Sequence, residues 1–374
     1  MNNLICTSCK KTYPLIEPLW KCSCGGLLDI EFTPRFPFDR IRSRKPTIWR
    51  YREAIPVEDD KNIVSFGEGY TPLLEIMYND IPVVIKLDFL FPTGSFKDRG
   101  ASVLVSKVKE LGIGTIVEDS SGNAGAALAA YSARAGIKCD IYVPEETSMA
   151  KVTQIQCCCA ILHKIHGSRE DTALAALKAA ETSYYASHSW NPFFLQGTKT
   201  FAFEVCEQLG WRAPDTLVLP VGNGTLLLGA YIGFQELTAA GIITRMPRMI
   251  AVQSARCAPL YRAFMDNVPE IPEISKEYTV AEGIAVARPV RGKQVVDAVK
   301  KSGGYFITVE EHEIIDAQKD LCRKGLFVEP TAAVAAAGVR RYIRDIRQGE
   351  IIVTVLTGHG LKSTEKADHL LGVR

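Results

Sequence analysis

The feature that most constrains this chain is an alternation of short apolar runs with helical stretches, which begins near Ile81. Short apolar runs bounded by turn residues are typical of strands buried on both faces of a parallel sheet. The pattern predicts strands at Thr115–Val117, Cys139–Val143, Ala160–Ile165, Thr216–Pro220, Met249–Val252 and Ile351–Leu356. It predicts helices at Asn123–Ala135, Arg169–Ser183, Thr198–Leu209, Thr225–Ala239, Glu311–Lys324 and Thr331–Arg344. The fold class is therefore α/β, with mostly parallel sheets covered by helices.

Length and composition set the broad class of protein. The 374 residues suffice for two medium lobes, and ligands of such open sheets bind beyond the carboxyl ends of the strands. A formal net charge of +2 gives no electrostatic reason to expect nucleic acid or a membrane surface as a partner. No apolar run approaches the roughly 20 residues of a membrane span, and no secretory leader is recognisable. With 11 cysteines, an odd number, a reducing cytoplasmic location is expected.

One lysine stands out at a strand-to-helix junction. Lys97 lies in Pro92-Thr93-Gly94-Ser95-Phe96-Lys97-Asp98-Arg99-Gly100, between the apolar run Val83–Leu87 and a helical pattern over Ala101–Leu111. Packing would fix its stem and aim its amine at whatever the loop borders. A desolvated lysine loses its proton readily and can form a Schiff base with an aldehyde. A solvated lysine on the first turn of a helix is the simpler alternative.

Two further strand-to-helix loops are suited to binding anions. Ser120-Ser121-Gly122-Asn123 opens the helix after the 115–117 strand, so its backbone amides point toward an anionic group. Val221-Gly222-Asn223-Gly224-Thr225 follows the 216–220 strand, and glycines allow amides to crowd around a phosphate. An ordinary helix cap and close helix-to-strand packing are the respective alternatives.

Together these sequence motifs resemble those of the fold type II pyridoxal-phosphate enzymes, the group that includes tryptophan synthase β. Within this group they most resemble the threonine synthase-like family. The resemblance rests on Ser95–Gly100, on Gly67-Glu68-Gly69-Tyr70-Thr71-Pro72-Leu73, on the two loops above, and on Leu356-Thr357-Gly358-His359-Gly360-Leu361-Lys362. It implies a two-lobed fold, with a small mobile lobe at 97–187 and a large cofactor-binding lobe at 31–96 and 188–374. It also implies a homodimer and a small amino-acid substrate.

The resemblance implies roles for individual residues. Lys97 would hold pyridoxal phosphate and then act as the acid and base, and Asn123 would bond the phenolic oxygen of the cofactor. Gly222, Asn223, Gly224 and Thr225 would hold its phosphate, and Thr357 would meet the pyridine nitrogen. Ser120, Ser121 and Gly122 would bind the substrate carboxylate. A hydroxyl at the ring nitrogen suits loss of a β or γ substituent better than exchange of amino groups.

The residues expected to contact the substrate differ from the sequence pattern of the family. The family typically has the motif Asn-Ser-x-Asn-Pro-Tyr-Arg. The corresponding residues here are His188-Ser189-Trp190-Asn191-Pro192-Phe193-Phe194, so that histidine replaces the first asparagine and phenylalanine replaces the arginine. Ala124 also replaces a threonine hydroxyl. Without the guanidinium of this arginine, the binding of a substrate phosphate is expected to be weaker. The candidate substrate-binding residues are His188, Ser189 and Lys199.

Three functions follow from these residues. The first is threonine synthase, which converts O-phosphohomoserine and water to threonine and phosphate. The second is a β-replacing synthase similar to cysteate synthase, or a lyase that eliminates from serine or threonine. The third is a cofactor-binding protein without turnover, which the intact Lys97, Asn123 and Thr357 disfavour.

The first thirty residues form a separate cysteine-rich segment. Cys6-x2-Cys9 is followed after twelve residues by Cys22-x-Cys24, which resembles the spacing of a zinc ribbon. Four thiolates on two turns can bind zinc tetrahedrally. The alternative is that the two cysteine-bearing turns pack together without a metal ion. Related threonine synthases often carry a similar segment.

Overall fold

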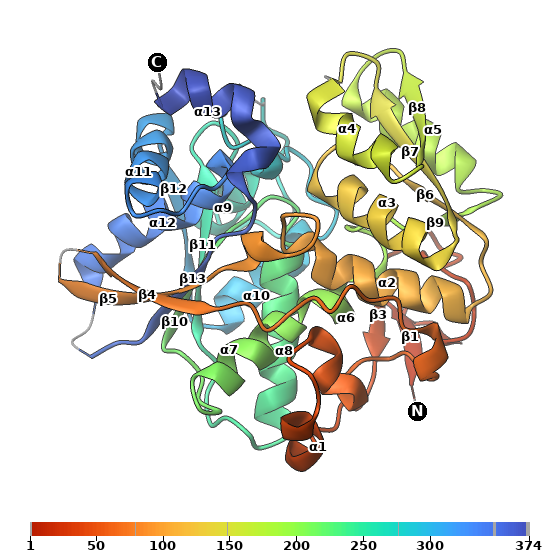
Figure 1. Ribbon diagram of the computed structural model, residues 1–374, viewed down its shortest axis with the longest axis horizontal. Coiled ribbons are helices and arrows are strands. Elements are labelled where there is room, and N and C mark those ends of the chain that lie inside the picture. Colours follow the sequence, from red (N-terminus) through yellow and green to blue (C-terminus); the bar gives the residue numbers. More distant parts are fainter. Residues whose placement is uncertain (1, 79, 148, 276, 347–348, 372–374) are drawn as a thin grey trace. The chain divides into compact units, whose positions relative to one another are not determined.

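The structure, a computed structural model, describes residues 2–78, 80–147, 149–275, 277–346 and 349–371. The chain divides into two compact units, shown by their elements in Figure 1. Unit 1 comprises residues 1–69 and 97–200, and unit 2 comprises residues 70–96 and 201–374.

Unit 1 is built on a four-stranded parallel sheet in the order β8-β7-β6-β9. Its strands are β6 (Thr115–Glu118), β7 (Lys138–Pro144), β8 (Ile161–Ile165) and β9 (Tyr184–Tyr185). Its helices are α2 (Lys97–Glu110), α3 (Asn123–Ala135), α4 (Met149–Cys157), α5 (Arg169–Ala179) and α6 (Pro192–Thr198). Because β6 and β9 are parallel neighbours, the loops that follow them lie at the same edge of the sheet.

An N-terminal ribbon belongs to the same unit. It consists of β1 (Asn3–Cys6), β2 (Thr12–Pro14) and β3 (Leu28–Glu31), an antiparallel sheet in the order β2-β1-β3. Trp20 packs edge-to-face on Tyr185 at 4.9 Å and on Trp190 at 5.6 Å between ring centroids. These aromatic contacts join the ribbon to the core of unit 1.

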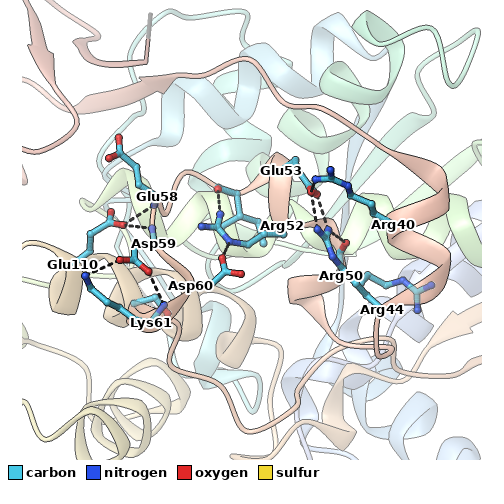
Figure 2. A network of polar contacts seen from close by, with 12 residues as sticks. Arg40, Arg44, Arg50, Arg52, Glu53, Glu58, Asp59, Asp60, Lys61 and Glu110 are labelled. Atoms are coloured by element: carbon cyan, nitrogen blue, oxygen red, sulfur yellow. Dashed lines mark hydrogen bonds and ion pairs between the residues drawn. The ribbon is translucent and has the colours of Figure 1, made fainter.

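The segment after the ribbon contains helical turns. These are α1 (Phe38–Ser43) and the 3-10 helices η1 (Ile48–Ala54) and η2 (Asp60–Asn62). Figure 2 shows the ion pairs of this segment and the Glu110 carboxylate of α2, which accepts the backbone N–H of Glu58 and Asp59. Trp49 Nε1 also donates to Ser102 Oγ at 3.0 Å. By their contacts, residues 31–69 and 188–200 therefore belong to the same unit as residues 97–187. From the sequence, these two segments were expected in the large lobe.

Unit 2 contains a six-stranded sheet in the order β12-β11-β10-β13-β5-β4. Its strands are β4 (Leu73–Tyr78), β5 (Ile81–Lys86), β10 (Thr216–Pro220), β11 (Arg248–Ser254), β12 (Tyr305–Val309) and β13 (Ile352–Val355). All of them are parallel except β4, which pairs antiparallel with β5 at the edge. In the sequence only two residues separate Tyr78 from Ile81, with which it pairs, and only antiparallel strands can be joined by so short a connection.

The helices of unit 2 pack around this sheet. They are α7 (Thr200–Gln208), α8 (Thr225–Ala239), α9 (Pro259–Met265), α10 (Gly292–Lys301), α11 (Glu311–Arg323), α12 (Pro330–Tyr342) and α13 (Thr364–Leu371), with the 3-10 turns η3 (Asp88–Leu90), η4 (Glu282–Ile284), η5 (Ile343–Asp345) and η6 (Gly360–Ser363). Within the described ranges, no helix is both long and apolar enough to span a membrane.

Candidate functional site

Lys97 is the first residue of α2, directly after a turn in which Gly94 has a φ of +81°. Its Nζ lies 5.6 Å from the centroid of the Phe194 ring, a residue of α6. Phe194 is fully buried, and a Cβ added to Gly100 would come within 2.3 Å of its Cε1 atom. The glycine one turn after Lys97 therefore makes room for this ring, through which α6 contacts the lysine side chain.

The residues just before Lys97 are tied to the loop that contains Thr357. The backbone N–H of Phe96 donates to the Thr357 carbonyl at 3.0 Å, and Ser95 forms an isolated bridge with Gly358. The Thr357 side chain is buried, and its Oγ1 has no hydrogen-bond partner among the described residues. A buried hydroxyl without a partner is costly, so it points to a ligand atom that completes the site.

The glycine loop in unit 2, the candidate phosphate cradle, directly precedes the N-terminus of a helix. Thr225 begins α8, a 15-residue helix, and Gly224 just before it has a φ of +78°. A Cβ on Gly224 would lie 2.2 Å from Val295 Cγ2, and a Cβ on Gly222 would lie 2.8 Å from Ile284 Cα. Both positions therefore require glycine. Since β10 and β13 are parallel neighbours, this loop and Thr357 lie at the same sheet edge.

The serine loop of unit 1 has the expected place at a helix N-terminus. Asn123 begins α3, and the backbone N–H of Gly122 donates to Ser120 Oγ at 3.3 Å. A Cβ on Gly125 would lie 1.9 Å from the carbonyl oxygen of Ser120, so the loop packs tightly on its own helix. His188 and Ser189 follow β9 and thus lie at the same edge of the sheet as this loop.

The structure adds Glu118, which the sequence analysis did not single out. His188 Nδ1 lies 2.8 Å from Glu118 Oε1, and both side chains are buried. Burial, together with the neighbouring Asp119, holds the pKa of the Glu118 carboxyl well above its ordinary value. Burial, reinforced by the positive charges of Lys97 and Arg169, holds the pKa of the His188 imidazole well below its ordinary value. Both pKa shifts favour the uncharged forms of the two side chains.

The remaining candidate, Lys199, is fully buried in unit 1. Its Nζ lies 2.5 Å from Gln196 Oε1 and 5.2 Å from the centroid of the Phe32 ring. The predicted site residues thus divide between the units: Lys97, Ser120, Ser121, Gly122, Asn123, His188, Ser189 and Lys199 in unit 1, and Gly222, Asn223, Gly224, Thr225 and Thr357 in unit 2.

The four N-terminal cysteines are brought together as the spacing predicts. The Sγ atoms of Cys6, Cys9, Cys22 and Cys24 all lie within 4.8 Å of one another. A hydrogen bond from the Cys24 backbone and one from the Tyr13 hydroxyl lower the pKa of the Cys22 thiol to about 6. Thiolates at such distances repel one another unless a cation lies between them.

The observations in both units fit pyridoxal phosphate. A buried hydroxyl without a partner suits the ring nitrogen, a glycine cradle at a helix N-terminus suits the phosphate, and an amine at a loop-to-helix junction suits the aldehyde. Residues 64–358 match the family described as "Pyridoxal-phosphate dependent enzyme". Fold and site together define a pyridoxal-phosphate dependent enzyme of fold type II.

Curated relatives narrow this class. The chain is 39% identical to the threonine synthase of Methanocaldococcus jannaschii, over 97% of this chain and 93% of the relative. It is 35% identical to the threonine synthase of Methanosarcina acetivorans, over 98% and 93%. The processed threonine deaminase isoform 2 of Solanum lycopersicum has the same fold, with a TM-score of 0.70, 22% identity and 96% and 95% coverage. The chain belongs to the threonine synthase-like family of these enzymes.

Proposed function

We propose that this protein is a threonine synthase, which converts O-phosphohomoserine and water to threonine and phosphate. The observation that carries the proposal is the match to two enzymes named threonine synthase over more than nine-tenths of each chain. The matches to solved structures, at identities below 25%, support the fold and not the substrate. The relatives therefore favour this reaction over that of the deaminases that share the fold.

The proposed cofactor residues come from both units. Lys97 would bind the aldehyde carbon, Asn123 the phenolic oxygen, Thr357 the ring nitrogen, and Gly222, Asn223, Gly224 and Thr225 the phosphate. When bound, pyridoxal phosphate acts as an electron sink that makes the Cα–H of an amino acid acidic. The neutral hydroxyl of Thr357 accepts or donates a hydrogen bond without protonating the ring, which favours loss of a side-chain substituent.

The Lys97 amine has a second role once the substrate amine has replaced it. It takes the proton from Cα and returns a proton to the substrate carbon chain, so one amine is both base and acid. The buried Phe194 ring, with its centroid 5.6 Å from Nζ, covers the amine from one side. The backbone amides of Ser120, Ser121 and Gly122, at the N-terminus of α3, would bind the substrate carboxylate. His188, Ser189 and Lys199 would bind the substrate side chain.

A second function is favoured by Phe194. Its ring fills the space against Gly100, at the position where the family pattern has an arginine, and Ala124 offers no hydroxyl. An apolar wall suits a smaller, uncharged side chain. A β-replacing synthase, or a lyase acting on serine or threonine, is therefore the alternative.

The two functions are separated by product analysis. Purified enzyme loaded with pyridoxal phosphate is given O-phosphohomoserine, O-phosphoserine, serine or threonine in turn, and phosphate and amino acids are measured. We expect equal amounts of threonine and phosphate from O-phosphohomoserine, and no turnover by Lys97→Ala. Lys109→Ala, on the outer part of the same helix, is the control that should retain activity. Turnover of serine or O-phosphoserine alone would move the assignment to the alternative.

We also propose that Cys6, Cys9, Cys22 and Cys24 bind one structural zinc ion, since their sulfur atoms lie within mutual reach. Elemental analysis should give about one zinc per chain. The double variant C9S/C24S should lose it, whereas C157S, at an exposed cysteine outside the cluster, should not. Equal zinc content in all three proteins would contradict the site. The homodimer, the small mobile lobe at 97–187 and the cytoplasmic location stay predictions.

A further inference from the structure

A cavity of about 440 Å³ lies in unit 2, away from the residues assigned to the cofactor. Strands β5 and β13 run parallel, and their carboxyl ends point toward the sheet edge that carries Thr357. The cavity instead borders Tyr78, the last residue of β4, which pairs with Ile81 at the amino end of β5. The six residues of β5 span about 17 Å, so the cavity and Thr357 lie at opposite ends of the sheet.

Cationic side chains dominate the polar lining of this cavity, which lies between β4 and the ends of α11 and α12 (Figure 1). Lys324 caps the C-terminus of α11, Arg340 lies in the last turn of α12, and Arg344 follows in η5. The Asp320 carboxylate accepts from Lys324 Nζ at 2.6 Å and from Arg340 at 2.9 Å. Arg344 forms no ion pair with a described residue. Among the described lining residues, three cations thus face one carboxylate.

The ends of α11 and α12 account for only part of this positive charge. Each helix C-terminus carries about half a negative charge, which a nearby cation offsets. Arg323, outside the cavity, also lies in the last turn of α11 and contributes to this offset. Asp320 and the two helix ends together balance about two of the three lining cations, so a positive surplus remains in the cavity.

The Tyr78 hydroxyl is a buried donor without an acceptor. Its side chain is 5% exposed, and its OH has no hydrogen-bond partner among the described residues. Burial raises the pKa of Tyr78 to about 12, so the phenol keeps its proton near neutral pH. Lys324 Nζ lies 5.9 Å from the centroid of the same ring. An unpaired buried donor is costly, and an anion held by the neighbouring cations would supply its acceptor.

We propose that this cavity is a second ligand site, which binds the phosphate group of a small phosphate monoester. Guanidinium groups hold phosphate oxygens in pairs, and Arg340 keeps donors beyond the one given to Asp320. Arg344 supplies the surplus charge, and the Tyr78 hydroxyl supplies a further hydrogen bond. No bond of the ligand breaks, and the site does not depend on which reaction the enzyme catalyses.

The cavity also has room for the organic part of such a ligand. Met77 and Ile343 add apolar side chains to its lining. A volume of about 440 Å³ is in the range of sites for small organic molecules, and is larger than phosphate alone requires. A monoester with an apolar body should therefore bind more tightly than inorganic phosphate.

Calorimetric titration of the enzyme loaded with pyridoxal phosphate tests the site, since the cofactor then fills the candidate phosphate cradle. The probes are phenyl phosphate, inorganic phosphate and phenol. Wild type should bind phenyl phosphate roughly tenfold or more tightly than either of the other two, because only this probe joins the anion to an apolar body.

Two variants each remove one proposed contact. R344Q should weaken the binding of phenyl phosphate roughly tenfold, because it removes the surplus charge. Y78F removes only the hydroxyl and should weaken binding about fivefold. Its thermal unfolding temperature should stay unchanged or rise, since the hydroxyl that it loses is buried without a partner. The control is R323Q, which makes the same change of charge at the end of α11 but outside the cavity, and should bind as wild type does.

Each other result overturns a part of the proposal. Equal binding of phenyl phosphate by wild type, R344Q and Y78F would place the ligand elsewhere in the enzyme. Equal losses in R344Q and R323Q would show a general effect of surface charge and no site. Inorganic phosphate or phenol binding as tightly as phenyl phosphate would show that the cavity does not recognise a monoester. None of these results alters the product analysis with O-phosphohomoserine, so this proposal and the proposed function can fail separately.

Discussion

The backbone N–H of Phe96 donates a 3.0 Å hydrogen bond to the carbonyl oxygen of Thr357. This bond fixes the residue before the candidate Schiff-base lysine to the residue assigned to the ring nitrogen. Both ends of the bond lie in unit 2, so the loop that leads to Lys97 is anchored on the sheet edge that carries Thr357. A change at Thr357 should therefore act on the cofactor and leave the fold intact.

We expect T357V to be neutral or stabilising in the protein without cofactor. Removing a buried hydroxyl without a partner relieves a desolvation penalty of about 1 kcal/mol or more. Turnover should fall by roughly tenfold or more, since the contact to the ring nitrogen is lost. Urea unfolding and phosphate release measure the two effects. T354V is the control, because Thr354 Oγ1 donates to the Val218 carbonyl at 2.7 Å and its loss should destabilise by about 1 kcal/mol.

We expect G224A to weaken cofactor retention. The substitution adds strain at a positive φ and drives a methyl group toward Val295, so the cradle must open. The control is G241A, which has a φ of +69° but no atom within 4 Å of the added carbon. G241A should cost about 1 kcal/mol of stability with unchanged cofactor affinity. Equal cofactor dissociation constants for both variants, measured by equilibrium dialysis, would contradict the cradle.

We expect G100A to disturb the support of Lys97. The added methyl group would overlap Phe194, which should cost about 1–3 kcal/mol and shift the absorbance of the bound cofactor. The double variant G100A/F194L replaces the ring by a smaller side chain, and should recover part of the stability. A double-mutant cycle of thermal unfolding measures the coupling. If the two changes were additive, Phe194 would not be the group that Gly100 accommodates.

Acid should weaken unit 1 through Glu53, which Figure 2 shows beside Arg44. Two hydrogen bonds of 2.6 Å from Arg44 lower the pKa of Glu53 to about 2. A depressed pKa gives stability that is present above the ordinary carboxyl pKa and is lost as pH falls through about 2. E53Q should therefore lower the free energy of unfolding by about 2 kcal/mol at pH 7, and by less as pH falls below about 4.5.

The control for this pH effect is E58Q, at an exposed carboxyl in the same segment. It should change the free energy of unfolding by less than about 0.5 kcal/mol at either pH. Urea denaturation at pH 7 and pH 3.5 gives both comparisons. A constant difference between E53Q and wild type across this range would show that the ion pair is not linked to protonation.

Sequence patterns located the parallel core well, because buried strands and capped helices leave local signals. The helices Asn123–Ala135 and Thr225–Ala239 and the strand Thr216–Pro220 have the predicted bounds. The helix expected over Thr198–Leu209 is instead two helices, α6 and α7, with Lys199 between them. The antiparallel edge strand β4 was not predicted, since its exposed residues lack a continuous apolar run.

The family motifs gave the candidate site, but not its buried partners. Glu118 has no local signal, because only the pairing of β6 with β9 brings it to His188. The space for Phe194 depends likewise on how α2 and α6 pack around Gly100, which is far from it in sequence. Such contacts come from tertiary structure and cannot be read from spacing.

The most direct test of the central claim is turnover of O-phosphohomoserine in water enriched in 18O. The proposed reaction expels phosphate by breaking the bond between Cγ and oxygen, and then adds water at Cβ. Mass spectrometry should therefore find the label in the hydroxyl of threonine and none in the released phosphate. Label in the phosphate, with homoserine in place of threonine, would show simple ester hydrolysis and contradict the account.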